Sequence, residues 1–458
     1  MIKQAVSRRS LFLAIYGIAW KLLLPTVATL NRLGILPRDW RVAERFGVLR
    51  SAGGATPDTI WLHCASLGEA KGLWALVRTL VSEEDCSVIT PSPLRILVTS
   101  NTFTGLDFLK RECALLPTET IVGAPEVHAS IAPFDHPTIV KRFITAQNVR
   151  IIGLYEAEIW PHYIQVSAKQ NIPVLLVSAR MSTSAHSLYR KFPGARARLL
   201  TRINWIQTQS ENERLRLENL GAGALSTGFD LKAAHYLRTY RQASLRTISV
   251  PQTDGNPSAR NRLAMVSLHI QEFHQLLPEL PTLLDKFNIA IFPRHLKELP
   301  HFRRSLEAFW KSHGFAMHSS DPQARNVLVD SMGQVEGILP SCRLAFVGGS
   351  LIPIGCHNLW EPVLAGLKTY FGPWCGNQES LAKLLVERGI AEVVDKVAQL
   401  RMWSEPGPEV EEACRLLVEE SREALNGALS ECRERIFVTL QSRSGYSVAA
   451  DHSRGKAP

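Results

Sequence analysis

Several short motifs that define common enzyme classes are absent from this chain of 458 residues. No G-x-G-x-x-G follows the first predicted strand, which argues against a dinucleotide oxidoreductase, and the absence of G-x-x-x-x-G-K-[ST] argues against a P-loop NTPase. The patterns G-x-S-x-G and H-E-x-x-H are also missing, and no cysteines have paired zinc-site spacing. We therefore expect neither a bound metal nor a cofactor.

The chain has few of the sequence features that are typical of nucleic-acid-binding proteins. It contains no dense block of Lys and Arg and no RNA-binding aromatic motif. Its 52 basic side chains exceed its 42 acidic ones, which gives a formal net charge of +10. A basic excess favours an anionic partner, either acidic lipid or a phosphorylated substrate, and nucleic acid ranks lowest among the three.

The eight cysteines are scattered, and no pair has C-x-x-C spacing. Several lie in apolar runs, as buried free thiols do. A reducing compartment is the simplest interpretation, and an exported protein with a few disulfides is the alternative.

A long apolar run is present at the N-terminus. Residues 11–30 are largely apolar, apart from Lys21, and a helix that crosses a bilayer needs about 20 such residues. We predict a single N-terminal membrane anchor that spans the bilayer or lies in its interface, with membrane lipid as a partner. A buried helix of the first domain and an export signal beginning at Ser7-Arg8-Arg9 are the alternatives.

From Ile60 onward one pattern repeats: a short apolar run, small or polar residues, and a helical stretch. We predict strands at residues 60–65, 96–99, 151–154, 174–177, 205–207, 263–266, 289–292, 327–329, 344–347 and 369–371. Strands that alternate with helices form parallel sheets covered on both faces. The predicted fold class is α/β, with two Rossmann-like, doubly wound parallel-sheet domains facing a cleft and an N-terminal membrane-anchoring helix.

The predicted domain boundaries follow from this pattern. The segments are an anchor at 1–35, a first Rossmann-like domain at 36–237, a linker at 238–261, a second Rossmann-like domain at 262–425, and a C-terminal helix with a frayed tail at 426–458. The linker is inferred from Pro, Gly and Asn with little apolar periodicity. Open α/β sheets bind ligands outside the carboxyl ends of their strands. We therefore expect the catalytic and ligand-binding residues directly after each apolar run.

The most informative stretch is Leu344–Ser350 with His357–Pro362. A buried strand, a Gly-Gly turn and a helix over 358–365 would form a pocket where the helix start attracts phosphate. Asn358 and Glu361 are three residues apart, so both can face one nucleotide. A Gly-Gly turn between packed elements, with no ligand, explains the pattern equally well.

Acidic side chains follow two strands of the first domain. Glu69 is expected to open a helix, whose N-terminus would keep its pKa low and make it a base, although an ordinary first-turn Glu is simpler on position alone. Glu156 and Glu158 precede Trp160 and could orient a sugar or a catalytic group, or form a solvated acidic turn. Thr102 is expected to cap a helix rather than bind an oxyanion.

Basic side chains follow other strands. Arg180 could hold a carboxylate or phosphate through two hydrogen bonds, or pair with Glu156 or Glu158. In the second domain His269, Arg294 and residues 330–334 each follow an apolar run, and together with Gly348-Gly349 they indicate a nucleotide pocket.

These residues together resemble one family, the Kdo transferases of lipopolysaccharide synthesis, where Kdo is 3-deoxy-D-manno-octulosonic acid. The resemblance runs from about Arg45 to the helix after Asn377. The motifs that carry it are Ala65-Ser66-Leu67-Gly68-Glu69, Thr102-Phe103-Thr104-Gly105, Glu156-Ala157-Glu158-Ile159-Trp160-Pro161, Ala179-Arg180-Met181-Ser182, Pro293-Arg294-His295, Asp330-Ser331-Met332-Gly333, Ala345 to Pro362, and Phe371-Gly372-Pro373.

The resemblance implies a two-domain GT-B glycosyltransferase that moves Kdo from CMP-Kdo to a lipid A precursor at the cytoplasmic face of the bacterial inner membrane. It implies that Glu69 is the general base and that Glu156 and Lys232 support the transition state. The implied substrate-binding residues are Ser66, Gly68, Arg180, His269, Pro293, Arg294, Met332, Gly333, Gln334, Gly349, Asn358, Leu359, Trp360 and Glu361.

The chain departs from the family pattern at four positions. Gln334 stands where Glu is usual, Cys356 replaces a Gly, Lys232 comes one residue late in T-G-x-x-K, and Leu268 replaces a hydroxyl residue before His269. The alternatives are therefore another GT-B transferase or epimerase that uses a different nucleotide sugar, and a non-catalytic CMP-binding membrane protein.

Overall fold

The computed structural model describes residues 11–37, 40–47, 57–82, 94–116, 125–181, 183–239, 262–403 and 406–444. The chain divides into a first unit (Met1–His235 with Ala424–Pro458) and a second unit (Tyr236–Glu423). Each unit is built on its own parallel sheet. The predicted linker at 238–261 lies outside the described residues except for its first two positions, as do residues 1–10 and 445–458.

The first unit contains a seven-stranded sheet in the order β3-β2-β1-β4-β5-β6-β7, with all neighbours parallel. Its strands are β1 (Asp58–Cys64), β2 (Leu94–Ser100), β3 (Glu126–Ile131), β4 (Val149–Tyr155), β5 (Val174–Ala179), β6 (Trp205–Thr208) and β7 (Leu225–Thr227). The chain winds outward in both directions from β1 and β4. In such a sheet, the carboxyl ends of these two strands flank the usual ligand crevice.

Helices cover both faces of this sheet. They are α2 (Val42–Arg45), α3 (Leu67–Leu80), α4 (Phe103–Ala114), α5 (Pro137–Ala146), α6 (Pro161–Lys169), α7 (Thr183–Lys191), α8 (Pro193–Leu199), η3 (Leu200–Arg202), α9 (Glu211–Glu218) and α10 (Ala233–Thr239). One face packs on α5, α6, α8 and α9 through a cluster that includes Trp61 and Phe143. The adjacent Ile60 and Leu62 point to the opposite face, because successive side chains of a strand alternate between the two faces. They are also fully buried, so this second face is covered as well.

The second unit contains another parallel seven-stranded sheet, in the order β10-β11-β9-β8-β12-β13-β14. Its strands are β8 (Arg262–Leu268), β9 (Asn288–Pro293), β10 (Phe315–Met317), β11 (Asn326–Leu328), β12 (Leu344–Val347), β13 (Lys368–Phe371) and β14 (Ala391–Val393). Leu263 and Met265 belong to one apolar cluster, and Ala264 and Val266 to another. Both faces of this sheet are therefore buried, which explains the continuous apolar runs.

The helices of the second unit are mostly short. They are α11 (Ile270–Leu276), η5 (Leu277–Glu279), α12 (Leu280–Lys286), η6 (Leu296–Glu298), α13 (Leu299–Ser305), α14 (Glu307–Trp310), α15 (Val335–Ile338), η7 (Leu339–Ser341), α16 (Trp360–Leu364), η8 (Gly376–Gln378), α17 (Glu379–Glu387) and η9 (Val397–Met402). The two doubly wound parallel sheets confirm the predicted α/β fold class.

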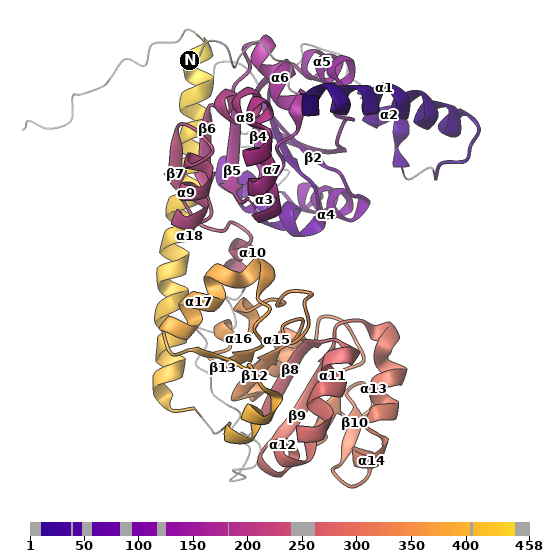
Figure 1. Cartoon of the computed structure of the whole chain (residues 1–458), viewed down its shortest axis with the longest axis vertical. Helices are drawn as coiled ribbons and strands as arrows, with labels where there is room; N and C mark the ends of the chain where they lie inside the picture. The colour runs from indigo at the N-terminus through magenta and orange to yellow at the C-terminus, as the bar shows by residue number, and fades with distance from the viewer. Residues whose placement is uncertain are drawn as a thin grey trace, which may run out of the picture. The chain divides into compact units, whose positions relative to one another are not determined.

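The ten predicted strands are all present, and four more are found at the sheet edges: β3, β7, β10 and β14. The C-terminal helix α18 (Pro408–Ser444) is present but begins well before the boundary predicted at 426. Its residues from Ala424 belong to the first unit, where Figure 1 shows α18 in yellow beside β6 and β7. Gln207 of β6 attaches it there, because the Gln207 Nε2 donates to the Ala428 carbonyl at 2.9 Å.

The N-terminal helix α1 (Leu11–Arg32) is long and apolar enough to cross a membrane, with a mean hydropathy of 1.6 over Leu13–Arg32. Only 11% of that window is buried, which is unlike a helix of a protein core. Figure 1 draws α1 in indigo on the side of the first unit that carries α5 and α6.

One side of α1 is attached to the first unit. The Tyr16 hydroxyl donates to Asp135 Oδ2 at 2.8 Å, and the ring of Trp20 packs on Phe134. Residues at helical spacing on the other side are exposed, among them Ile15, Ile18 and Leu22. The helix therefore presents an apolar surface that the described part of the protein does not cover.

Candidate functional site

Glu69 lies in the first turn of α3, directly after β1. Its Oε2 accepts from the Ala65 N–H at 2.7 Å and its Oε1 from the Ser66 hydroxyl at 3.2 Å. The Ser66 oxygen accepts in return from the Glu69 N–H at 3.4 Å. This reciprocal cap begins the helix, so Ser66 has a structural role as well as its predicted binding role.

The expected low pKa of Glu69 is wrong. Burial is the largest cause of a raised pKa, and the charge of Glu158 raises it further, although the Ala65 N–H, Lys232 and Ser66 act in the opposite direction. The helix N-terminus favours the anion, but here it does not compensate for the lost hydration of the carboxylate. A carboxylate with a raised pKa holds a proton more firmly, which makes it a stronger base.

Glu156 is placed by a strained turn at the end of β4. Its φ is 54°, in the left-handed region that Glu seldom adopts. The side chain is 9% exposed, and its Oε1 accepts from Lys232 Nζ at 2.7 Å and from Gln209 Nε2 at 3.3 Å. Burial raises the pKa of Glu156 to about 7, although the Lys232 ammonium lowers it.

Lys232 reaches Glu156 from the turn between β7 and α10. Asp230 shapes that turn, because its Oδ1 accepts from the Lys232 N–H at 2.9 Å. The Lys232 side chain also passes Gly68, where a Cβ would lie 4.0 Å from its Cε. The structure thus brings the three predicted catalytic residues, Glu69, Glu156 and Lys232, to the side of the first sheet where the carboxyl ends of its strands lie.

Two residues on this side of the sheet were not among the predicted site residues. Glu158 Oε2 accepts from the Trp160 indole N–H at 2.5 Å and lies 3.4 Å from the Nε2 of His63. His63 is fully buried on β1. The acidic motif pointed to Glu158, whereas His63 lies inside an apolar run, and only the pairing of β1 with β4 brings it beside Glu158.

Arg180 follows β5. Its charge lowers the pKa of Asp230, whose carboxyl pKa is nevertheless raised by burial. The cation that pairs with Glu156 is Lys232, whose Nζ lies 2.7 Å from Glu156 Oε1. Thr102 caps α4 as expected, because its Oγ1 accepts from the Gly105 N–H at 3.2 Å.

In the second unit, the turn after β12 is organised by a residue that was not predicted. Glu272 of α11 is fully buried, and its carboxylate accepts from the N–H groups of Gly349, Ser350 and Leu351 at 2.6, 2.9 and 2.8 Å. These are the donors that a Gly-Gly phosphate loop would offer to a ligand. These three N–H groups already donate to Glu272, so they are not available to a ligand.

Basic side chains gather beside this turn. The Nε2 atoms of His269 and His357 are 2.8 Å apart, and the ring of His295 lies 5.6 Å from that of His269. The Arg294 N–H donates to the Leu268 carbonyl at 2.9 Å, which joins the ends of β8 and β9. Burial lowers the pKa of His357 to about 4, and Arg294, His269 and His295 lower it further.

The helix expected over 358–365 is shorter than predicted. α16 spans only Trp360–Leu364, and Leu359 is its N-cap residue. Asn358 lies before it, where its Oδ1 accepts from the Trp360 N–H at 3.0 Å. The Asn358 Nδ2 is buried and has no hydrogen-bond partner among the described residues. Asn358 therefore offers a donor from a loop, whereas Glu361 lies within the helix.

The remaining predicted binding residues follow the ends of β9 and β11. Pro293 is the last residue of β9. Met332 is 69% exposed, Gly333 has a φ of 79°, and Gln334 is the N-cap residue of α15. Among the residues that the structure describes, no group of His, Cys, Asp and Glu has the arrangement of a metal site.

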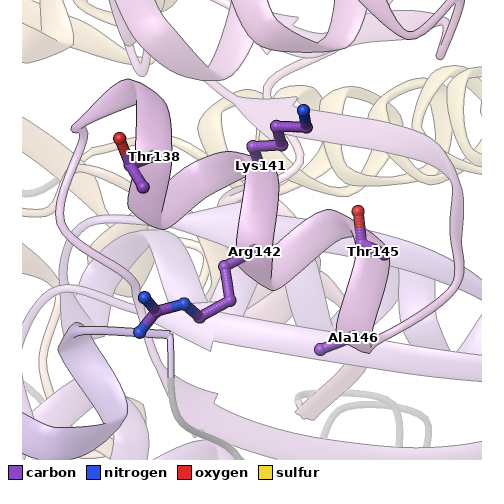
Figure 2. Close-up of a pocket in the computed structure, with 5 residues that line it drawn as sticks. All are labelled: Thr138, Lys141, Arg142, Thr145 and Ala146. Atoms are coloured by element: carbon purple, nitrogen blue, oxygen red, sulfur yellow. The ribbon is translucent and has the colours of Figure 1, made fainter.

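A hollow of about 400 Å³ lies elsewhere, along one helix of the first unit. Figure 2 shows its lining on α5: Thr138, Lys141, Arg142, Thr145 and Ala146. All five residues are exposed, and none belongs to the predicted site. The hollow is therefore a surface feature of α5 and is separate from the strand ends described above.

Two doubly wound parallel α/β units place the chain in the GT-B fold class. The same fold is present in UDP-GlcNAc 2-epimerase from Neisseria meningitidis, with a TM-score of 0.50 and 11% identity over 84% of this chain and 100% of that one. Residues 40–234 match the family described as 3-Deoxy-D-manno-octulosonic-acid transferase (kdotransferase).

Relatives extend the match over both units. The 3-deoxy-D-manno-octulosonic acid transferase of Haemophilus influenzae is 26% identical over 77% of this chain and 80% of its own length. A bifunctional glycosyltransferase/methyltransferase of Fusobacterium nucleatum is 23% identical over 75% of this chain, which spans 51% of that protein. The chain is therefore similar to Kdo transferases, through the family match over residues 40–234 and through relatives matched over about three quarters of its length.

Proposed function

We propose that this protein is an inverting glycosyltransferase that moves Kdo from CMP-Kdo to a lipid A precursor, lipid IVA, during lipopolysaccharide assembly. The match of residues 40–234 to the Kdo transferase family and the relatives named for Kdo transfer support the reaction class. The observation that carries the proposal is the group at the carboxyl ends of the strands in the first sheet, where Lys232 pairs with Glu156 near the capped carboxylate of Glu69.

Glu69 would act as the general base. It would take the proton from a hydroxyl of the acceptor sugar as that oxygen bonds to the anomeric carbon of Kdo. The oxygen would attack from the face opposite CMP, which inverts the configuration, and the bond from that carbon to the CMP phosphate would break with its electron pair remaining on the phosphate. The raised pKa of Glu69 suits this step, because a base works best with a pKa near the working pH.

Glu156 and Lys232 would support the charge that develops on the sugar. An oxocarbenium-like ring carries positive charge, which a carboxylate stabilises, and the ammonium of Lys232 can accompany either Glu156 or an anionic oxygen of Kdo. The ion pair between them is 2.7 Å long and its Glu156 side is only 9% exposed, so it is already organised before substrate binds.

The second unit would bind the CMP part of the donor. Arg294 and the three histidines beside it could meet the phosphate, and the buried Nδ2 of Asn358 offers a donor to the nucleotide. Glu272 would act indirectly, because it shapes the 349–351 turn and leaves those N–H groups unavailable to the ligand. The predicted cofactor requirement is none, with CMP-Kdo as the donor substrate.

The acceptor is an acylated lipid, so we propose that α1 holds the enzyme at the cytoplasmic face of the bacterial inner membrane. The attachment of Tyr16 to Asp135 and the exposed row of Ile15, Ile18 and Leu22 favour a helix that lies in the interface. Membrane lipid would then be a partner together with CMP-Kdo and the lipid A precursor.

One assay tests the proposal directly. The full chain would be purified in detergent and incubated with CMP-Kdo and a tetraacyl lipid A precursor, and the lipid product would be analysed by mass spectrometry. A mass increase of one or more Kdo residues is expected, with the anomeric configuration of the product read by NMR. Transfer from another nucleotide sugar instead, or CMP binding without any product, would select one of the alternative functions.

A further inference from the structure

Glu156 has a second hydrogen-bond partner, Gln209, which is not among the predicted site residues. Gln209 comes directly after β6, and its Nε2 donates to Glu156 Oε1 at 3.3 Å and to Ser178 Oγ at 3.3 Å. The same Ser178 oxygen accepts from the Leu231 N–H at 3.2 Å. Lys232 is the next residue, and its Nζ lies 2.7 Å from Glu156 Oε1. Glu156 is therefore joined to the lysine turn both through the ammonium and through Gln209 and Ser178.

The chemistry of the partners fixes the orientation of the Gln209 amide. An ionised carboxylate only accepts hydrogen bonds, so the amide nitrogen must face Glu156 and the amide oxygen must face away from it. The nitrogen carries two protons, and the structure gives it two acceptors, one on Glu156 and one on Ser178. The amide is thus used fully as a donor at this place.

The backbone is distorted where the two acceptors lie. Glu156 and Ser178 have φ values of 54° and 52°, in the left-handed region that neither residue type favours. They are neighbours at the ends of β4 and β5, because the Glu156 N–H donates to the Val177 carbonyl at 3.0 Å. The pairing of β5 with β6 also shifts register between Leu176 and Ala179, as at a β-bulge. Bulges and strained residues of this kind re-aim side chains and are concentrated at functional sites.

The partners of Glu156 are distributed unevenly over its two oxygens. Gln209 and Lys232 both contact Oε1, and no residue that the structure describes donates a hydrogen bond to Oε2. A carboxylate that is 9% exposed normally uses both oxygens as acceptors. Oε2 therefore remains available as an acceptor or as a negative charge for a bound molecule.

We propose that Gln209 is a positioning residue for Glu156: together with Lys232 it holds Oε1, so that Oε2 is the oxygen left to meet the positive charge that develops on the donor sugar. Ser178 couples this hold to the turn that carries Lys232. The catalytic part of this role rests on the proposed function. The hydrogen bond from Gln209 to Glu156 is a property of the folded chain and can be measured without any turnover.

Several charged or titratable groups influence Glu156, whereas Gln209 is neutral at every pH. The groups are Lys232, Asp230, Glu69, Tyr155 and Cys64. The Lys232 ammonium lowers the pKa of Glu156, and the charges of Asp230 and Glu69 raise it. A neutral, donor-free replacement of Gln209 leaves all of these charges in place. Its effect on Glu156 therefore reports the lost hydrogen bond.

The direct test is a ¹³C NMR titration of the full chain labelled at the glutamate carboxyl carbons, with Glu156 assigned by its loss in Glu156→Gln. Gln209→Met keeps the length of the side chain but removes the donor, so the anion is less stable and the pKa of Glu156 should rise by about 0.5 to 1. Gln209→Glu keeps the shape and adds a like charge, so the rise should be larger. The control is Gln170→Met, at the carboxyl end of α6, which should leave the titration unchanged.

Kinetic measurements separate positioning from a general loss of structure. In Gln209→Met, kcat should fall about 10- to 100-fold while the KM for CMP-Kdo changes less than about threefold, because the displaced carboxylate acts mainly in the transition state. The acidic limb of the kcat profile should move to higher pH, in step with the NMR value.

A double-mutant cycle tests the part of Ser178. Ser178→Ala removes the oxygen that Gln209 and the Leu231 N–H share. Its effect on log kcat should be less than additive with that of Gln209→Met, since both variants break one network. Additive effects would exclude the coupling through Ser178.

An unchanged Glu156 titration in folded Gln209→Met or Gln209→Glu overturns the proposal. So does a wild-type kcat for Gln209→Met in an enzyme that transfers Kdo. If the titration moves as expected in a chain that does not transfer Kdo, the hold of Gln209 on Glu156 stands and the proposed function fails. The two ideas are therefore separable.

Discussion

The Nζ of Lys232 lies 2.7 Å from the Oε1 of Glu156, although Lys232 stands one residue later than the family spacing of T-G-x-x-K. The turn between β7 and α10 accommodates the additional residue. Leu231 is fully buried and its N–H donates to Ser178 Oγ at 3.2 Å, while Asp230 holds the Lys232 N–H. The later position of the lysine therefore does not prevent its ammonium from reaching the carboxylate.

Lys232→Met should impair the enzyme because it removes the cation paired with a buried carboxylate. The pKa of Glu156 and that of Glu69 should both rise, since Lys232 lowers each of them. We expect kcat to fall roughly 10²- to 10³-fold, as for the loss of one preorganised electrostatic group. Lys232→Arg keeps the charge and should retain most activity. A rate within threefold of wild type in Lys232→Met would remove the ion pair from the mechanism.

Glu69→Gln should abolish the base while preserving the helix cap. The amide oxygen can still accept from the Ala65 N–H, so the melting temperature should change little. The rate of Kdo transfer should fall roughly 10²- to 10⁴-fold. Glu213→Gln is a matched control, because Glu213 holds the same position after the cap residue Ser210 in α9. Equal rates in both variants would exclude Glu69 as the base.

Glu156 should make the stability of the first unit depend on pH. Its folded pKa of about 7 lies above its ordinary value of 4.5. Between these values the folded state binds more protons than the unfolded state, so the free energy of unfolding should fall as pH rises through this window. The contribution is on the order of 3 kcal/mol. Urea denaturation from pH 4.5 to 8 should show this slope in wild type and in Glu126→Gln, but a smaller slope in Glu156→Gln.

Glu272→Gln should destabilise the second unit. The carboxylate accepts three N–H groups from residues 349–351, and an amide would place its own N–H groups against one or more of them. We expect a loss of about 2–4 kcal/mol in the free energy of unfolding and weaker CMP binding. Denaturation and calorimetry measure these quantities, with the exposed Glu336→Gln as the control. Normal CMP affinity in the variant would show that the turn does not shape the nucleotide site.

The exposed face of α1 should determine membrane association. Changing Ile15, Ile18 and Leu22 together to Ser removes apolar area that the described residues leave uncovered, so binding to vesicles should fall at least about tenfold. Flotation with vesicles containing acidic lipid measures the bound fraction. Tyr16→Phe, which alters only the attached side, should bind vesicles normally. Unchanged flotation of the triple variant would exclude this face as the contact surface.

The strands missed from the sequence share one physical property. β3, β7, β10 and β14 are the edges of the two sheets, whereas all the predicted strands lie inside them. An interior strand is covered on both faces and needs a continuous apolar run. An edge strand is not so constrained: Glu126 at the start of β3 is exposed, and so is Glu392 in β14. Their patterns therefore carry too little signal to detect.

The residues of the candidate site also fall into two groups: those that the sequence motifs predicted and those that they did not. The acidic residues after β1 and β4 were visible as motifs, because polar side chains at the ends of apolar runs stand out. His63 and Glu272 were not visible, since one lies within an apolar run and the other within a helix. Their partners, Glu158 and the N–H groups of residues 349–351, are distant in the sequence and become neighbours through strand pairing.

By itself, the sequence determined the two parallel sheets, the position of the interior strands and the resemblance to the Kdo transferases, because these depend on local apolar periodicity and on short motifs in order. Only the tertiary structure decided the pKa shifts of the charged groups and the partners with which they pair. The direction of the Glu69 pKa, the pairing of Lys232 with Glu156 and the occupation of the 349–351 turn by Glu272 depend on burial and on distances between strand ends. Burial and such distances arise when the chain packs, and no window of the sequence contains them.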